Sequence, residues 1–221
     1  DFAQALTNSG QILGKIDLGY GADSLTNTGM IRGDVAMGVG DDTYDGGAGR
    51  LHGQLLGGQG DDVLTGGKGA DVIFGDDGIG DGPVGDDMLS GGKGADKLYG
   101  EEGDDTLVGG KGSDTLNGGH GGDTFVFTSI GDSRLGHADL IAGLDDSDMI
   151  RLSAIDADAT QAGNQDFNLV GALNGHAGQA ALVYDSFNDQ TRLELDTDGD
   201  GQANAVILID GDHRDFTNFA L

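Results

Sequence analysis

Residues 66–74 read GGKGADVIF, and this nine-residue pattern of glycines, an aspartate and an apolar residue decides the fold. Close copies stand at 91–99 (GGKGADKLY) and 109–117 (GGKGSDTLN). Every copy places an apolar residue two positions after its aspartate, a spacing that a flexible acidic linker has no reason to keep. The pattern therefore favours a stacked repeat architecture over a linker.

The nine-residue pattern accounts for most of residues 57–126, with an interruption, GDDGIGD, at 75–81. We interpret each copy as a glycine-rich turn followed by a short strand of three residues whose middle side chain points inward. The expected inward residues are Leu64, Ile73, Leu89, Leu98, Leu107, Leu116 and Phe125. One inward side chain per strand cannot form a core alone, so successive coils must stack with strands about 4.8 Å apart.

A longer repeat precedes this tract. Residues 8–26 align without gaps to 27–45, and 46–65 form a third copy with one extra residue. The alignment matches Asn8 with Asn27, Ile12 with Ile31, Gly14 with Gly33, Ile16 with Val35 and Asp23 with Asp42. Because twice nine is close to nineteen, we expect one kind of coil throughout, with two turns and two short strands. The sequence thus predicts an all-β fold, a right-handed parallel β-helix and β-roll solenoid.

Composition restricts the function. The 221 residues include 39 acidic and 11 basic side chains, a formal net charge of −28, which argues against nucleic acid or an anionic membrane as partner. Cysteine is absent, which excludes disulfides and thiolate metal sites. No apolar run approaches the roughly 20 residues of a membrane helix. Because the sequence starts at Asp1 instead of Met, we expect a piece of a longer protein.

Stacking creates a problem of charge that a cation would solve. It places Asp87, Asp105 and Asp123 along one edge of the roll, and Asp96 and Asp114 along the other, where like charges repel. Calcium accepts six to eight oxygens at about 2.3 to 2.6 Å, from carboxylates and backbone carbonyls alike. The candidate ligands in the turns are Asp23, Gly38, Gly40, Asp42, Gly58, Gly60, Asp62, Gly67, Gly69, Asp71, Gly85, Asp87, Gly92, Gly94, Asp96, Gly103, Asp105, Gly110, Gly112, Asp114, Gly119, Gly121 and Asp123. Calcium binding and folding should then be one event.

Some positions depart from the pattern. Pro83 and Glu101 replace the second glycine of their turns, which predicts strain, and Met37 replaces a first glycine. Leu51 stands where the 46–54 copy would have its aspartate, and the Asn-x-Gly turns at 8 and 27 also lack one. We therefore expect the N-terminal coils to bind calcium along one edge only, through Asp23, Asp42 and Asp62.

The nonapeptides GGQGDDVLT, GGKGADVIF, GGKGADKLY and GGKGSDTLN resemble the RTX (repeats-in-toxin, haemolysin-type) calcium-binding β-roll. Residues 121–209 resemble the C-terminal domain of serralysin-type secreted metalloproteases, and related tails occur on other RTX exoproteins, including alginate epimerases. The resemblance covers about residues 57–221 and implies the calcium β-roll at 57–126 and a β-sandwich-like C-terminal cap at 127–221. The longer repeats resemble only a β-helix generally, and they predict β-helix coils of about 19 residues at 1–56. Within the cap, AALVYD, TRLELD and AVILID predict antiparallel strands.

The resemblance also implies a cellular role. Such modules bind several calcium ions, fold after export by the type I secretion machinery of Gram-negative bacteria, and act outside the cell or at its surface. The C-terminal sequence DFTNFAL is similar to the family's uncleaved secretion signal. The alternative is the non-catalytic rear portion of an exoenzyme, a serralysin-like zinc protease in particular, and a structural surface protein is a third reading. An H-E-x-x-H motif upstream of Asp1 would indicate the protease.

An acidic loop segment and the histidines bear on whether the chain has a further metal site or a catalytic site. The segment DTDGDG, with Asp196, Asp198 and Asp200, imitates the start of an EF-hand loop, but Ile207 stands where the bidentate glutamate belongs. Asn204 could complete a smaller calcium site, and a polar hairpin turn remains the alternative. No histidine stands in a zinc motif and no nucleophile motif occurs, so we expect no enzyme activity in this chain.

Overall fold

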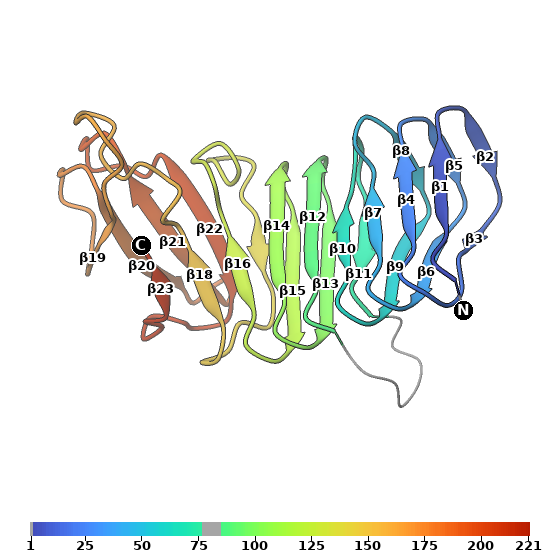
Figure 1. Cartoon of the computed structure of the whole chain (residues 1–221). Coiled ribbons are helices and arrows are strands. Elements are labelled where there is room, and N and C mark those ends of the chain that lie inside the picture. Colours follow the sequence, from blue (N-terminus) through green and yellow to red (C-terminus); the bar gives the residue numbers. More distant parts are fainter. Residues whose placement is uncertain (1, 77–84) are drawn as a thin grey trace.

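The computed structural model of the protein describes residues 2–76 and 85–221. Across these residues it contains strands and turns and no helix. The strands stack side by side into an elongated roll that starts near the N-terminus and ends in an antiparallel region near the C-terminus (Figure 1). The predicted all-β fold built from parallel sheets is confirmed.

Three sheets run along the roll. The nine-stranded sheet contains, in spatial order, β1 (Ala5–Asn8), β4 (Ser24–Asn27), β7 (Thr43–Asp45), β10 (Val63–Thr65), β12 (Met88–Lys93), β14 (Thr106–Lys111), β16 (Thr124–Val126), β18 (Met149–Arg151) and β23 (Phe219–Ala220). The eleven-stranded sheet contains β19 (Asn168–Val170), β20 (Gln179–Asp185), β21 (Gln190–Asp196), β22 (Ala205–Asp210), β17 (Leu140–Ile141), β15 (Thr115–His120), β13 (Lys97–Glu102), β11 (Val72–Phe74), β9 (Gln54–Gln59), β6 (Val35–Val39) and β3 (Ile16–Asp17). A three-stranded sheet of β2 (Gln11–Leu13), β5 (Met30–Arg32) and β8 (Arg50–His52) lies only in the N-terminal coils.

The third sheet corrects the expectation of two strands per N-terminal coil. Each long coil has three strands. In the first two coils the Asn-x-Gly segment forms a corner, and the chain then extends again before the next turn. At this corner the Asn8 side-chain amide donates to Asn27 Oδ1 at 2.8 Å, and Asn27 donates to the Tyr44 hydroxyl at 3.3 Å. Buried Asn8 and Asn27 thus satisfy each other across the layers.

The core is one column of apolar side chains between the sheets. All seven inward residues expected in the nonapeptides have no exposed surface. The register pairs Ile12 with Ile31 and Ile16 with Val35, as the sequence alignment predicted. Because a parallel stack brings the same repeat position to every layer, each buried side chain packs on its equivalents above and below.

The nonapeptide strands β10, β11 and β16 have the expected three residues, whereas the strands between them in the middle of the tract are longer. Strands β12 to β15 each have six residues and continue through the glycines into the next turn, where Gly92 pairs with Gly110 and Lys93 with Lys111. Glu101, at a second-glycine position, has a φ of 80°, a left-handed conformation that is costly for a residue with a Cβ. The expected strain at Glu101 is thus present, whereas Pro83 and most of the 75–81 interruption lie outside the described residues.

Parallel pairing continues beyond residue 126. Strand β17 pairs with β15, β18 pairs with β16, and β22 and β23 then extend the two large sheets. The three segments predicted as antiparallel strands are β20, β21 and β22, which do pair antiparallel. The cap as a separate unit at 127–221 stays a prediction, since pairing alone does not divide the chain there.

Candidate metal centre

A continuous ladder of aspartates runs along one edge of the roll, where turns lead from the eleven-stranded to the nine-stranded sheet. In each step a backbone N–H donates to Oδ1 of the aspartate one layer later; the Asp87 N–H, for example, donates to Asp105 at 2.8 Å. The ladder starts at the Gln4 N–H and contains Asp23, Asp42, Asp62, Asp87, Asp105, Asp123 and Asp148. We call this the first edge.

The opposite edge carries a shorter ladder of the same construction. The Asp71 N–H donates to Asp96 Oδ1, Asp96 to Asp114, and Asp114 to Asp139, each at 2.8 Å. This second edge begins only where the nonapeptides begin, because the N-terminal coils have the Asn corner there instead. The predicted division of Asp87, Asp105 and Asp123 from Asp96 and Asp114 is confirmed by these hydrogen bonds.

The second carboxylate oxygen of almost every ladder aspartate has no partner. Within the described residues, nine buried Oδ2 atoms accept no hydrogen bond, those of Asp23, Asp42, Asp62, Asp87, Asp96, Asp105, Asp114, Asp123 and Asp139. A buried carboxylate oxygen without a donor is costly, since it has lost its water. Repetition of this cost at nine positions indicates that a cation completes the arrangement.

The same burial disturbs the acidity of these groups. Loss of hydration raises the pKa of Asp62, Asp105 and Asp139 to about 8, and that of Asp87 and Asp96 to about 7. The donated backbone N–H opposes the rise, while neighbouring carboxylates along the ladders add to it. Without a cation, the folded ladders therefore hold protons near neutral pH.

In the nonapeptide turns the first glycine lies against the aspartate Oδ2, which is unpartnered except at Asp71, where it accepts the Gly67 N–H at 2.9 Å. A Cβ placed on Gly91 would stand 2.5 Å from Asp96 Oδ2 and 2.7 Å from the Gly109 carbonyl oxygen of the next layer. Distances of this size are close to those of calcium–oxygen bonds. Five glycines face both the Oδ2 of the following ladder aspartate and a glycine carbonyl oxygen of the next layer: Gly57, Gly75 and Gly100 on the first edge, Gly66 and Gly91 on the second. Gly75 opens the interruption before Asp87 and takes the first-glycine place there, and we count it with the first glycines. The carboxylate and carbonyl oxygens thus fit a hard cation.

The second and fourth glycines have a different role. A Cβ on Gly110 would collide with the Gly92 carbonyl, and one on Gly112 with the Gly94 carbonyl, so these positions stack directly on the preceding layer. The glycines that the sequence predicted as ligands are all second and fourth glycines of their turns. The first glycines, which lie beside the carboxylates, were not among the predicted ligands. Ligation by any individual residue stays a prediction.

The N-terminal coils have a modified first edge. Leu18 and Met37 occupy the first-glycine positions opposite Asp23 and Asp42, and both side chains are buried. Since a Cβ at the equivalent Gly57 would meet Asp62 Oδ2, these side chains begin in the space that glycine leaves open. Calcium ligation by Asp23 and Asp42 consequently has less room than at Asp62.

The EF-hand-like segment forms the turn between β21 and β22. Carboxylate oxygens of Asp196, Asp198 and Asp200 lie within 4.8 Å of one another. Buried Asp196 is already satisfied, since its Oδ1 accepts the Gly199 N–H and its Oδ2 the Gly201 N–H. Asn204 accepts the Thr197 N–H and donates to Asp198 Oδ2. This closed set of hydrogen bonds is compatible with a hairpin turn, and a calcium site here stays a prediction.

Sequence reasoning missed Asp139 and Asp148, which extend the two ladders by one layer each. Asp139 has no glycine at the first, second or fourth position of its turn, and Asp148 has only the first, Gly143, so the nine-residue template did not find them. Each nevertheless stands two positions before a buried apolar residue, Ile141 and Ile150 respectively. The Asp-x-apolar part of the pattern was therefore a sufficient signal.

Comparisons with known proteins agree with the repeat. The RTX calcium-binding nonapeptide repeat matches, in four copies, at residues 54–80, 84–116 and 99–128. Two similar solved structures are subunits of a mannuronan C5-epimerase from Azotobacter vinelandii. AlgE6R3 is 32% identical, covering 74% of this chain and 80% of its own, with a TM-score of 0.43. AlgE6R2 is 31% identical, covering 61% and 86%, with a TM-score of 0.46. No curated protein sequence matches significantly.

Proposed function

Because the chain contains RTX calcium-binding nonapeptide repeats, which bind calcium, we propose that it is a module of a secreted protein that folds when calcium fills its turns. The observation that supports this proposal is the row of buried, unpartnered Oδ2 atoms along both edges. A fold that buries so many carboxylate oxygens without donors needs a compensating positive charge.

We assign the strongest sites to the five first glycines that face two oxygens. Along the first edge, Asp62, Asp87 and Asp105 would each bind with the next first-glycine carbonyl, and along the second edge Asp96 would do the same. Asp71 would bind in the same way through an Oδ2 that also accepts the Gly67 N–H. Calcium supplies two positive charges per site and thereby removes the repulsion between layers. The chain's own glycines keep the space open, and the ladder hydrogen bonds fix each Oδ1 so that Oδ2 points inward.

This arrangement suits a protein that must be unfolded first and folded later. A chain with a net charge of −28 and a thin core has the composition of a disordered chain. Low calcium inside a cell would keep it extended for a type I exporter, and millimolar calcium outside would fold it. Among the described residues, no helix is long and apolar enough to cross a membrane.

The remaining parts of the proposal concern the C-terminal region and the parent protein. We assign residues 127–221 to a serralysin-like cap that carries the secretion signal, with its end held by pairing of β23 and β18. Co-expression with a type I exporter tests this part: scrambling residues 215–221 should stop export while calcium binding persists. Export at an unchanged level would show that residues 215–221 do not contain the secretion signal.

The folding proposal is tested by far-ultraviolet circular dichroism during a calcium titration, with magnesium as the control. We expect a coil spectrum in chelator and a β spectrum in calcium, with little response to magnesium, which prefers rigid octahedral sites. Equal β content in excess chelator at neutral pH would refute calcium-dependent folding.

A further inference from the structure

One turn of the first edge carries an additional buried carboxylate, that of Asp76. Asp76 directly follows Gly75 and therefore stands at the second position of its turn, where the next layer of the same edge has Glu101. Only 7% of Asp76 is exposed, whereas Glu101 is half-buried. A buried carboxylate is costly unless donors or a cation compensate its charge.

The Asp76 carboxylate lies close to the ladder aspartates Asp87 and Asp105. The Glu102 N–H, in the turn that leads to Asp105, donates to Asp76 Oδ2 at 3.2 Å. Burial raises the pKa of Asp87 to about 7, and Asp76 is the carboxylate that adds most to this rise. Burial likewise raises the pKa of Asp105 to about 8, and Asp76 again adds to the rise. Asp76 thus belongs to the gap between these two layers.

The same gap contains two of the oxygens that we assign to calcium. Asp87 Oδ2 is buried and accepts no hydrogen bond. This atom and the Gly100 carbonyl oxygen both border the place where a Cβ of Gly75 would stand, and Asp76 is the next residue of that turn. At the corresponding place on the second edge, Gly91 is followed by another glycine. An ion in the gap at Asp87 would therefore have two carboxylates beside it instead of one.

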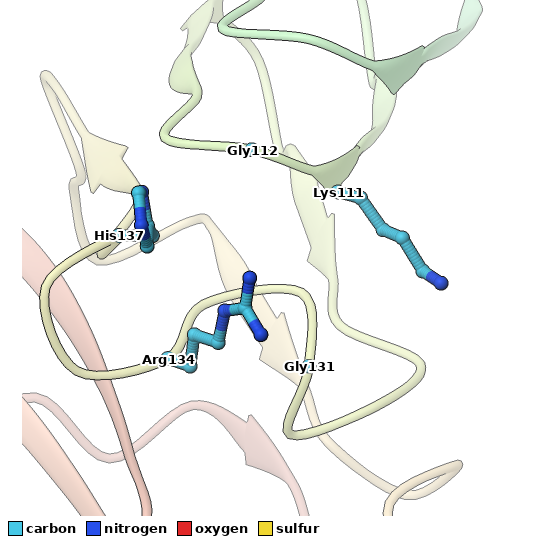
Figure 2. A pocket seen from close by; sticks show the side chains of 5 residues that line it. All are labelled: Lys111, Gly112, Gly131, Arg134 and His137. Atoms are coloured by element: carbon cyan, nitrogen blue, oxygen red, sulfur yellow. The ribbon is translucent and has the colours of Figure 1, made fainter.

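The side chains around the two edges differ in charge. On the second edge, the third position of successive turns carries Lys93 and Lys111, which pair across the layers. Lys111 also lines a cavity of about 390 Å³ together with Arg134 (Figure 2). On the first edge, the third position one layer after Asp76 is Glu102. Nearby cations oppose the binding of a divalent cation and nearby carboxylates favour it, so the first edge attracts calcium more strongly.

We propose that Asp76 is a calcium ligand, and that the site formed by Asp76, Asp87 and the Gly100 carbonyl binds calcium more tightly than the other sites of the roll. Two carboxylates neutralise the two charges of the ion, and calcium affinity depends on the number of charged ligands. This inference rests on the proposed function, calcium binding between layers. It adds an order to that function, because this site fills first and empties last.

The hydrogen bond from Glu102 offers a second explanation of Asp76, in which its side chain only holds the strand register. Asp76→Asn separates the two roles, since the asparagine oxygen still accepts the Glu102 N–H but has no charge. Glu101→Gln is the matched control, because it removes the same charge at the same turn position one layer later. If Asp76 acts only through the hydrogen bond, Asp76→Asn and Glu101→Gln should behave alike.

The experiment starts from the folded, calcium-loaded chain and lowers the free calcium concentration with a chelator buffer. Equilibrium dialysis counts the bound ions, and circular dichroism follows the roll. We expect the parent chain to keep its last ion down to a free calcium concentration about tenfold lower than Asp76→Asn does, and Glu101→Gln to stay within about twofold of the parent. At saturating calcium all three proteins should have the same β content.

Equal retention of calcium by Asp76→Asn and the parent, or equal losses in both variants, would overturn the inference while calcium-dependent folding stands. Failure of Asp76→Asn to form β structure at saturating calcium would assign Asp76 to the strand register and also reject the inference. Full β content of the parent in excess chelator would instead refute the proposed function, and this inference with it.

Discussion

Replacement of Gly91 by alanine places one methyl group in the space that the proposed calcium site needs. The new Cβ would stand 2.5 Å from Asp96 Oδ2 and 2.7 Å from the Gly109 carbonyl oxygen. Ordinary carbon–oxygen contacts are longer, so the aspartate or the next layer has to shift. Gly91 does not have a left-handed φ, so alanine adds no backbone strain of its own. The substitution therefore tests the space of the proposed calcium site and not the backbone conformation.

The expected magnitude follows from mass action. At calcium ten times above its dissociation constant, one site contributes about 1.4 kcal/mol, and five sites contribute about 7 kcal/mol. If Gly91→Ala removes one site, the remaining four must supply the same total free energy, and the calcium concentration at the folding midpoint rises about twofold. Overpacking that costs a further 1 to 3 kcal/mol extends the rise to about three- to sevenfold.

The assay is a calcium titration followed by circular dichroism, with calorimetry to count bound ions. Gly10→Ala is the matched control, because a Cβ at Gly10 has no atom within 4 Å and φ there is also not left-handed. We expect Gly91→Ala to shift the midpoint upward and to bind fewer ions, while the control keeps both. An unchanged midpoint and ion count for Gly91→Ala would refute the assignment of this space to calcium.

Three further predictions address the ladders. In chelator, the metal-free chain should gain β structure as pH falls from 8 toward 5. Burial raises the pKa of Asp62, Asp105 and Asp139 to about 8 in the folded state, whereas an aspartate of the unfolded chain has a pKa near 3.9, so the folded state binds more protons in this pH range. A gain of β structure on raising the pH would contradict this. Asp105→Ala should lower the cooperativity of calcium binding as well as the ion count, since Asp105 also accepts the Asp87 N–H, whereas Asp146→Ala at an exposed position should change neither. Loss of a single site alone would argue against coupled layers. Asp148→Ala should weaken calcium binding measured by calorimetry, because Asp148 accepts the Asp123 N–H at the end of the first edge. Asp146→Ala at an exposed position should leave binding unchanged. Equal behaviour of the two variants would show that Asp148 is not part of the calcium-binding ladder.

Strict spacing made much of the fold predictable. An apolar residue two positions after each aspartate specifies one buried side chain per strand, so the inward residues from Leu64 to Phe125 could be named without a structure. The pairing of Ile12 with Ile31 followed from the same logic, because stacked coils bring equal repeat positions together. Where the sequence is periodic, register is a consequence of the period.

Other features depended on contacts between layers that the linear sequence does not show. The third strand of the N-terminal coils depends on a corner formed by Asn8 and Asn27, whose side chains bond across layers. The role of Gly91 appears only when the next layer is in place, since the carbonyl that a Cβ would meet belongs to Gly109. Asp139 and Asp148 were missed because their turns are built without the glycine template.

The most direct test is a diffraction experiment on crystals grown in calcium, with anomalous scattering to locate the ions. Our account predicts calcium between successive layers on both edges, bonded to the Oδ2 atoms of residues such as Asp96 and Asp105 and to first-glycine carbonyls. Layers in the same register, with water or side-chain cations beside those carboxylates, would contradict it.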